Sequence, residues 1–165
     1  MRIGTGKRGP GTVRVVEITV LVILALSLLG GWLFIRSGVY PIAATEEHLG
    51  IEVRVIEALR DHSVQRYAAD LTVPDLEDRD RRLMGAVQYD AMCVVCHGAP
   101  GQDAGAMAEG LMPRPPRLDE ELHRSAAEQF WITREGLKFT GMPGWGPTHN
   151  DEELWAVVAL LQIMP

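Results

Sequence analysis

The feature that most constrains this chain is a long apolar run close to its N-terminus. From Ile18 to Ile35 the sequence reads ITVLVILALSLLGGWLFI without a charged side chain, and three valines extend the run past the single Glu17. A helix of about 20 apolar residues is long enough to cross the roughly 30 Å hydrocarbon core of a bilayer. The sequence therefore predicts a transmembrane helix over residues 15–36.

Charged and aromatic residues around the run indicate its orientation. Trp32 and Tyr40 lie near its C-terminal end, where amphipathic rings prefer the membrane interface. Four basic residues precede the run: Arg2, Lys7, Arg8 and Arg14. Because an excess of basic residues marks the cytoplasmic side, residues 1–14 are predicted to be cytoplasmic. The chain after Arg36 then lies outside, which in a bacterium is the periplasmic side of the inner membrane.

A cleaved secretory signal is the alternative to a retained anchor. Such a signal has an apolar core of about 7–15 residues followed by a small-residue cleavage site. The run in this chain is longer, and Pro41-Ile42-Ala43-Ala44 matches such a site only weakly. We therefore favour a retained single-pass anchor, and both interpretations export the rest of the chain.

The exported part is strongly acidic. The chain has 16 basic and 22 acidic residues, and four of the basic ones and Glu17 precede Arg36, which leaves 12 basic and 21 acidic residues from Arg36 onward. This balance excludes a basic patch for nucleic acid. An acidic surface favours positively charged docking partners, because it steers their encounter.

A helical pattern continues after the anchor. Apolar residues recur every fourth position between Thr45 and Tyr67, which predicts an amphipathic juxtamembrane helix that serves as a spacer, with a docking surface as the alternative. Pro74 then breaks the pattern. Residues 37–77 are therefore predicted to be a periplasmic helix and linker, and residues 78–165 a separate domain of about the usual size.

Helix signals and loop signals alternate through this domain. A helical pattern leads into the cysteines described below, and a segment rich in Gly, Pro and Ala follows at residues 98–116. Ser125-Ala126-Ala127-Glu128 is a capping box that opens a helix, which Gly136 closes. After a second loop at residues 140–150, Asn150 is the N-cap of the last helix. Because strand-like alternation is absent, the domain is predicted to be all-α.

The chain's two cysteines stand three positions apart in Cys93-Val94-Val95-Cys96-His97. Each thiol can add to a vinyl group of haem, and the adjacent histidine can then bind the iron as an axial ligand, so this pattern is the attachment signature of c-type haem. A structural zinc site needs more ligands, and a thioredoxin-like site needs a βα pattern that is missing here. The sequence predicts one covalent haem c held by Cys93, Cys96 and His97.

A second axial ligand decides between electron transfer and ligand chemistry at the iron. Met142 lies in Thr140-Gly141-Met142-Pro143-Gly144-Trp145-Gly146, where glycines and proline fix a loop and a thioether has no obvious packing purpose. Met/His ligation raises the potential of cytochromes c. We expect Met142 to be the ligand. A loop methionine that covers the haem edge is the alternative, and His149 is the next candidate.

With these features, the chain resembles the class I cytochromes c, and more closely their small membrane-anchored monohaem members from bacteria. Over about residues 80–165, the order of helix, Cys-x-x-Cys-His, loop, helix, Met loop and helix is that of the family. Gly85 and Tyr89 match the family's glycine and aromatic positions ahead of the first motif cysteine. Their spacing places them on one helix face, where the last helix can cross and Leu154 or Trp155 would fill the crossing.

The resemblance implies further site residues. Pro116-Arg117-Leu118 is similar to the family's Pro-x-Leu, in which the proline carbonyl accepts a hydrogen bond from the ligand histidine and the leucine packs on the haem; Pro113 and Pro115 are alternatives. Met142 to Gly146 is similar to the Met-Pro-x-aromatic-Gly loop of bacterial members, in which Trp145 would bind a haem propionate or shield the haem edge. Two arginines either pair with propionates or are exposed: Arg114 and Arg117.

The predicted function is electron transfer. With both axial positions filled by protein, iron can change its redox state without binding a substrate, and the remaining residues suggest no general base, nucleophile or substrate pocket. The sequence thus indicates an electron carrier rather than an enzyme, with a quinol-oxidising complex, a terminal oxidase or a dehydrogenase as membrane-bound partner. The alternatives are a haem enzyme or gas sensor with an open sixth site, and a haem subunit with a mainly structural role.

Overall fold

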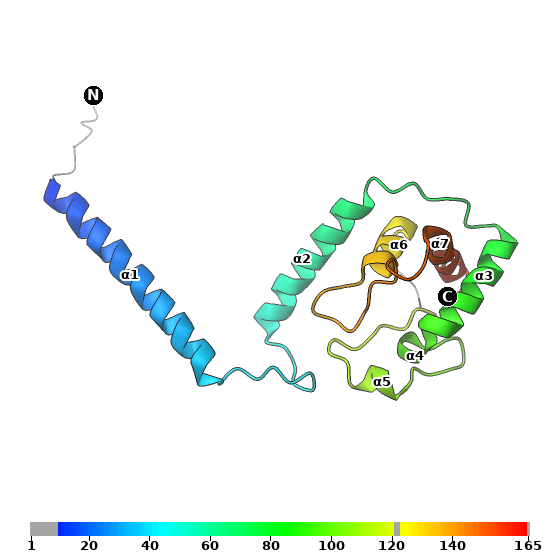
Figure 1. The fold of residues 1–165 in the computed structure, drawn as a ribbon, viewed down its shortest axis with the longest axis horizontal. Helices are drawn as coiled ribbons and strands as arrows, with labels where there is room; N and C mark the ends of the chain where they lie inside the picture. The colour runs from blue at the N-terminus through cyan, green and yellow to red at the C-terminus, as the bar shows by residue number, and fades with distance from the viewer. Residues whose placement is uncertain (1–9, 121–122, 165) are drawn as a thin grey trace, which may run out of the picture. The chain divides into compact units, whose positions relative to one another are not determined.

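The computed structural model describes residues 10–120 and 123–164, and this part of the chain is helical and contains no strand. The predicted all-α fold is therefore confirmed. The chain divides into two compact units, one ending at Ala43 and the other beginning at Ala44. The helices in the described residues, shown in Figure 1, are α1 (Pro10–Ser37), α2 (Gly50–Ala68), α3 (Arg79–Met92), α4 (Val94–His97), α5 (Ala106–Glu109), α6 (Ala126–Glu135) and α7 (Asp151–Leu161).

The long apolar run forms α1. From Gly11 to Ser37 this helix has the length and composition of a membrane span, a property that it shares with signal sequences near an N-terminus. Its apolar side chains are exposed along its whole length. At its C-terminal end Arg36 lies over the ring of Trp32, with 5.9 Å between the guanidinium carbon and the ring centroid. An apolar helix with these residues at one end suits a bilayer better than water.

Helices α3 and α7 pack against each other (Figure 1). Their backbones meet closely at Gly85 of α3. A β-carbon on Gly85 would lie 2.0 Å from the carbonyl oxygen of Ala156, so only glycine lets the two backbones meet. The sequence predicted this face of α3 correctly, but the prediction that Leu154 or Trp155 fills the crossing is wrong. The backbone carbonyl of Ala156 occupies it, so backbone and not a large side chain fills the crossing.

Leu154 and Trp155 pack instead against α6. The Trp155 ring stacks on Phe130 at 4.0 Å between centroids and 7° between planes, and both Leu154 and Val158 are fully buried in the same cluster. Stacked aromatic pairs add about 0.5–1.5 kcal/mol to the free energy gained by burial. This cluster fixes α6 against α7 and so determines where the loop between them lies.

Capping residues set the ends of α6 and α7. Glu128 N donates to Ser125 Oγ at 3.3 Å and Glu153 N donates to Asn150 Oδ1 at 3.0 Å, while each glutamate carboxylate accepts from the cap's own N–H. Gly136, with φ of 70°, ends α6. These are the caps that the sequence predicted, and each of the two N-caps contributes about 1 kcal/mol to helix stability.

Helix α2 packs along α6 within the same unit (Figure 1). Its Val64 and Ala68 are buried, and the Tyr67 ring stacks on Trp131 with 5.8 Å between centroids. Asp61 accepts a hydrogen bond from Arg124 at 2.6 Å. The helix that we expected to be a spacer thus contacts α6, because its second half carries buried apolar residues and Tyr67 on the side toward α6.

The segment between α2 and α3 also contributes to the packing. Leu71 and Leu76 are partly buried against the cluster around Phe130 and Trp155. Arg82 of α3 donates to the Leu76 carbonyl at 2.9 Å, which fixes the end of this segment. Residues on both sides of position 78 therefore support the same core.

Candidate functional site

The two cysteines lie where α3 ends and α4 begins. Cys93 is the C-cap of α3 and is buried, whereas Cys96 of α4 is half-buried, and both are free thiols. His97 N donates to the Cys93 carbonyl at 2.8 Å, so a single helical turn carries all three side chains. Burial, reinforced by the neighbouring Cys96, raises the pKa of the Cys93 thiol to about 12. Neither sulfur is engaged in a disulfide.

The imidazole of His97 is oriented by a backbone carbonyl. Its Nδ1 lies 2.7 Å from the Pro116 oxygen, the contact that the family resemblance implies. Since a carbonyl oxygen can only accept, Nδ1 carries the proton and Nε2 keeps its lone pair, the state required of a metal ligand. Burial lowers the pKa of His97 and the Pro116 bond opposes this effect. The ring is therefore neutral at neutral pH.

The turn that follows His97 is held from α3. Tyr89 donates its hydroxyl to the Gly98 carbonyl at 2.8 Å, and Ala99 and Gln102 exchange two backbone hydrogen bonds. Gly98 has φ of 69°, and a β-carbon there would lie 2.7 Å from the Gln102 carbonyl oxygen. Burial raises the pKa of Tyr89, which therefore stays a hydrogen-bond donor. The sequence indicated Tyr89 as a packing residue and gave no sign of this bond.

Both arginines considered as propionate partners bind carboxylates of this chain. Arg117 donates from Nε to Asp119 at 2.8 Å and from Nη2 to the Ala99 carbonyl at 3.2 Å. This ion pair lowers the pKa of Asp119. Arg114 is exposed and pairs with Glu109. Arg117 thus joins the turn after the motif to the segment that carries Pro116.

Close backbone contacts position the loop that contains Met142. A β-carbon on Gly144 would lie 2.7 Å from the Glu135 carbonyl oxygen, and one on Gly136 would lie 2.5 Å from the Gly144 nitrogen. Trp145 N also donates to the Thr133 carbonyl at 3.1 Å. The glycines that mark this segment as a loop in the sequence therefore let it lie directly on the end of α6.

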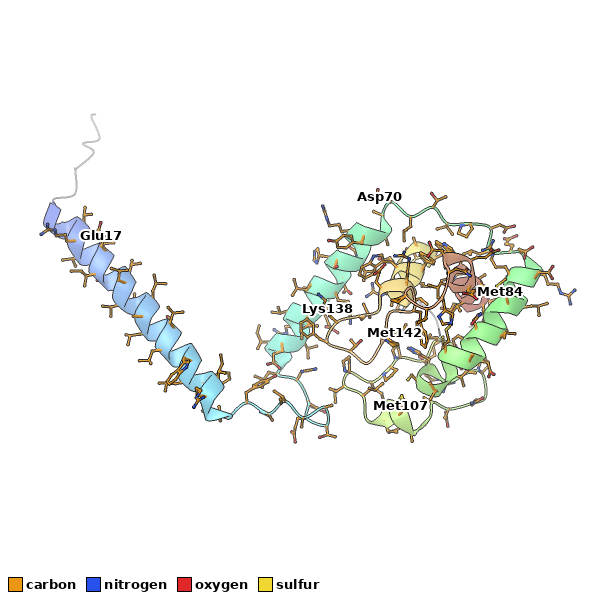
Figure 2. The ribbon with its side chains drawn as sticks, in the orientation of Figure 1. Glu17, Asp70, Met84, Met107, Lys138 and Met142 are labelled. Carbon is orange, nitrogen blue, oxygen red and sulfur yellow. The ribbon has the colours of Figure 1, made fainter. Side chains whose placement is uncertain are left out.

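Met142 itself is half-buried and anchored on both sides. Its N–H donates to Thr140 Oγ1 at 3.0 Å and its carbonyl accepts from Leu137 N at 3.2 Å. A β-carbon on the adjacent Gly141 would lie 2.6 Å from Leu111, so the two long loops meet here. In Figure 2, Met142 lies toward the middle of the domain, whereas Met84 and Met107 lie at its edge and are 38% and 62% exposed.

Trp145 and Leu118 add apolar side chains around the cysteine motif. Both are partly buried against the cluster that contains Tyr89, Met92, Cys93, Val94, Val157 and Leu161, and Trp145 also packs against the Phe130 cluster. The Trp145 ring meets His149 edge-on at 5.5 Å, and His149 Nδ1 lies 2.9 Å from Thr148 Oγ1. His149 is thereby held beside the start of α7 by its own neighbours.

These residues fit a c-type haem better than a protein-bound metal ion. Nowhere in residues 10–120 and 123–164 do three or more His, Cys, Asp or Glu side chains gather as ligands for an ion. A porphyrin brings its own four nitrogens, so the chain need supply two thiols, one or two axial ligands and apolar walls. Cys93, Cys96, His97 and the partly buried Leu118 and Trp145 meet these needs.

The fold and the site together define a helical domain whose residues fit a c-type haem. Residues 82–161 match the family model described as cytochrome c oxidase, cbb3-type, subunit III. This region is therefore a cytochrome c domain of the class I-like type. The matched range includes the cysteine motif and the segments that carry Pro116 and Met142. A comparison with curated proteins gave no match.

Proposed function

We propose that this chain is a membrane-anchored periplasmic c-type cytochrome that passes single electrons between respiratory partners. Cys93 and Cys96 would attach one haem, and His97 and Met142 would be the axial ligands of its iron. When bound, the haem supplies a one-electron ferrous/ferric couple. The observation that carries the proposal is the arrangement of His97, whose Nδ1 is engaged by Pro116 so that Nε2 is free for iron.

The chain's own residues provide a site suited to electron transfer. Pro116 and Tyr89 fix the proximal turn, and the contacts of Gly136 and Gly144 hold the Met142 loop on α6. Fixed ligands keep the geometry similar in both redox states, so little reorganisation accompanies the gain or loss of an electron. In this proposal the partly buried Leu118 and Trp145 line the walls of the haem site. Pro116 accepts the hydrogen bond from His97, and Leu118 packs on the haem, as the family resemblance implies.

The proposed location follows from α1 and the basic residues before it. A retained α1 would hold the acidic domain on the periplasmic face of a bacterial inner membrane, near a quinol-oxidising complex, a terminal oxidase or a dehydrogenase. The match to a subunit family of a membrane-bound oxidase supports a partner of this kind. In this proposal the domain is an electron carrier, free or as a subunit of a larger oxidoreductase.

Spectroscopy of the full chain, produced together with a haem-attachment system, tests the proposal. The haem should stay bound under denaturing conditions, and the ferric protein should show the weak red absorption band of sulfur-to-iron ligation. Met142→Ala should abolish this band and let the ferrous iron bind carbon monoxide, while the exposed Met107→Ala should behave as the unmutated protein does. Rapid carbon monoxide binding by the unmutated protein would favour an enzyme or sensor and contradict the carrier.

A further inference from the structure

A closed ring of contacts runs through the proximal side of the site. His97 is followed by Gly98 and Ala99, whose carbonyl accepts from Arg117 Nη2 at 3.2 Å. Arg117 follows Pro116, whose carbonyl oxygen lies 2.7 Å from His97 Nδ1. The chain therefore returns to its starting point through two hydrogen bonds, and Arg117 is the side chain that closes the ring.

Arg117 is itself fixed by two acidic residues. Its Nε donates to Asp119 Oδ1 at 2.8 Å, and Nη1 lies 3.3 Å from Asp103 Oδ1. The side chain of Asp119 is 12% exposed, whereas that of Asp103 is fully exposed. Asp119 thus provides the firm anchor and Asp103 a peripheral one. A guanidinium can hold both a carboxylate and a carbonyl because its donors lie in one rigid plane.

The peptide bond between Pro116 and Arg117 links the fixed position of Arg117 to the hydrogen bond of His97. The Pro116 carbonyl and the Arg117 nitrogen belong to one planar peptide unit, so a fixed Arg117 restricts the direction of that carbonyl. On the other side, Tyr89 holds the Gly98 carbonyl at 2.8 Å and leaves the turn little freedom to move away. A β-carbon on Gly98 would lie 3.4 Å from Arg117 Nη1, which shows how closely the turn lies on the guanidinium.

We propose that Arg117 is a positioning residue that aligns the Pro116 carbonyl with His97 and thereby sets the basicity of the axial ligand. The inference rests on the proposed function, since it assigns His97 to the iron. A well-aligned hydrogen bond makes the imidazole more basic and stabilises ferric iron. Loss of alignment therefore raises the midpoint potential and exposes the Nδ1 proton to exchange.

The test compares substitutions of equal charge in the haem-loaded full chain. Arg117→Lys keeps the positive charge but loses the planar fork, and Arg114→Lys makes the same change at an exposed site. In the ferrous protein, Arg117→Lys should speed hydrogen exchange at His97 Nδ1 about tenfold, the factor expected for one ordinary hydrogen bond. Its midpoint potential should rise, and Arg114→Lys should leave both quantities unchanged.

A second matched pair keeps the test valid if Arg117→Lys fails to fold. Asp119→Asn and Asp103→Asn remove one negative charge each, but Asp119 alone is the firm anchor of Arg117. Exchange at His97 Nδ1 should be faster in Asp119→Asn than in Asp103→Asn. Equal exchange rates within each pair would overturn the inference, because neither the planar fork of Arg117 nor its Asp119 anchor would then affect the His97 hydrogen bond. Failure of the unmutated chain to bind haem at all would instead contradict the proposed function.

Discussion

At the scale of single residues, several glycines let one backbone segment lie directly against another. Gly85 brings α3 onto the Ala156 carbonyl, and Gly136 and Gly144 bring the Met142 loop onto the end of α6. Such contacts leave no room for a methyl group, because protein interiors relax by only fractions of an ångström. These positions therefore determine where both faces of the site lie.

The contact at Gly85 makes a quantitative prediction. Gly85→Ala should lower the free energy of unfolding by about 3 kcal/mol, because the new methyl group would overlap the Ala156 carbonyl and push α3 from α7. Urea denaturation of the haem-loaded protein measures this loss. Gly110→Ala is the control, since its β-carbon would meet the Met107 carbonyl oxygen at an ordinary 3.8 Å. A loss at Gly85 no larger than at Gly110 would disprove the close crossing.

Single residues also show which features of the site could be predicted from the sequence. The cysteine motif and the Gly85 and Tyr89 positions could be predicted because they depend on short spacings along one helix. The contacts of Arg117 could not, because Ala99 and Asp119 reach it only after the intervening loop has folded. For the same reason the sequence did not predict that the Ala156 carbonyl, rather than a large side chain, fills the helix crossing.

At the scale of elements, α2 has two distinct faces. Val64 and Ala68 are buried toward α6, while Ile51, Val55 and Leu59 are 51–65% exposed on the first half of the helix.

The caps of α6 and α7 could be predicted because their partners lie three residues apart. The packing of α2 could not, because a four-residue apolar repeat fits a free amphipathic helix and a packed one equally well.

Paired valine substitutions on α2 separate these two faces. Val64→Ala should lower the free energy of unfolding by about 2 kcal/mol, because it removes buried methyl groups and leaves a cavity against α6. Val55→Ala should change it by less than about 0.5 kcal/mol, as is usual for an exposed site. Chemical denaturation of the two variants checks both values. Equal effects would mean that α2 does not pack through Val64.

The ion pair between α2 and the segment before α6 predicts a pH dependence. Hydrogen bonds from Arg60 and then Arg124 lower the pKa of Asp61 below its ordinary value of 3.8. Its ionised form therefore stabilises the fold above that value, and the contribution is lost as the pH falls through the folded-state pKa. Because the side chain is 43% exposed, the contribution at pH 7 should be only about 0.5 kcal/mol.

Unfolding of Asp61→Asn at a series of pH values tests this dependence. The variant should be less stable than the unmutated protein at neutral pH and equally stable once Asp61 is protonated. Asp70→Asn, just beyond the C-terminal end of α2, provides a control for the change in charge. A stability difference that persists unchanged into strong acid would show that Asp61 acts by packing instead of by its charge.

At the scale of the whole molecule, an apolar helix precedes an acidic unit that carries the proposed redox site. If α1 is retained, it confines that unit to the neighbourhood of membrane-bound partners and raises its effective concentration there. A tether of this kind changes encounter rates without changing the site, because the residues around His97 and Met142 all belong to the unit that begins at Ala44.

Replacing α1 by a signal that is cleaved on export tests the tether. The released protein should keep the absorption spectrum and midpoint potential of the full chain, yet dilute released protein should be oxidised by partner-containing membranes about 100-fold more slowly, because the linked encounter becomes bimolecular. Stopped-flow absorbance measures the rate of oxidation, and raising the released protein toward millimolar concentration should restore that rate.

If the full chain is itself recovered in soluble form with its first residues missing, α1 is a cleaved signal. If released and anchored proteins react equally fast while both retain haem, α1 is not needed to bring this domain to its partner.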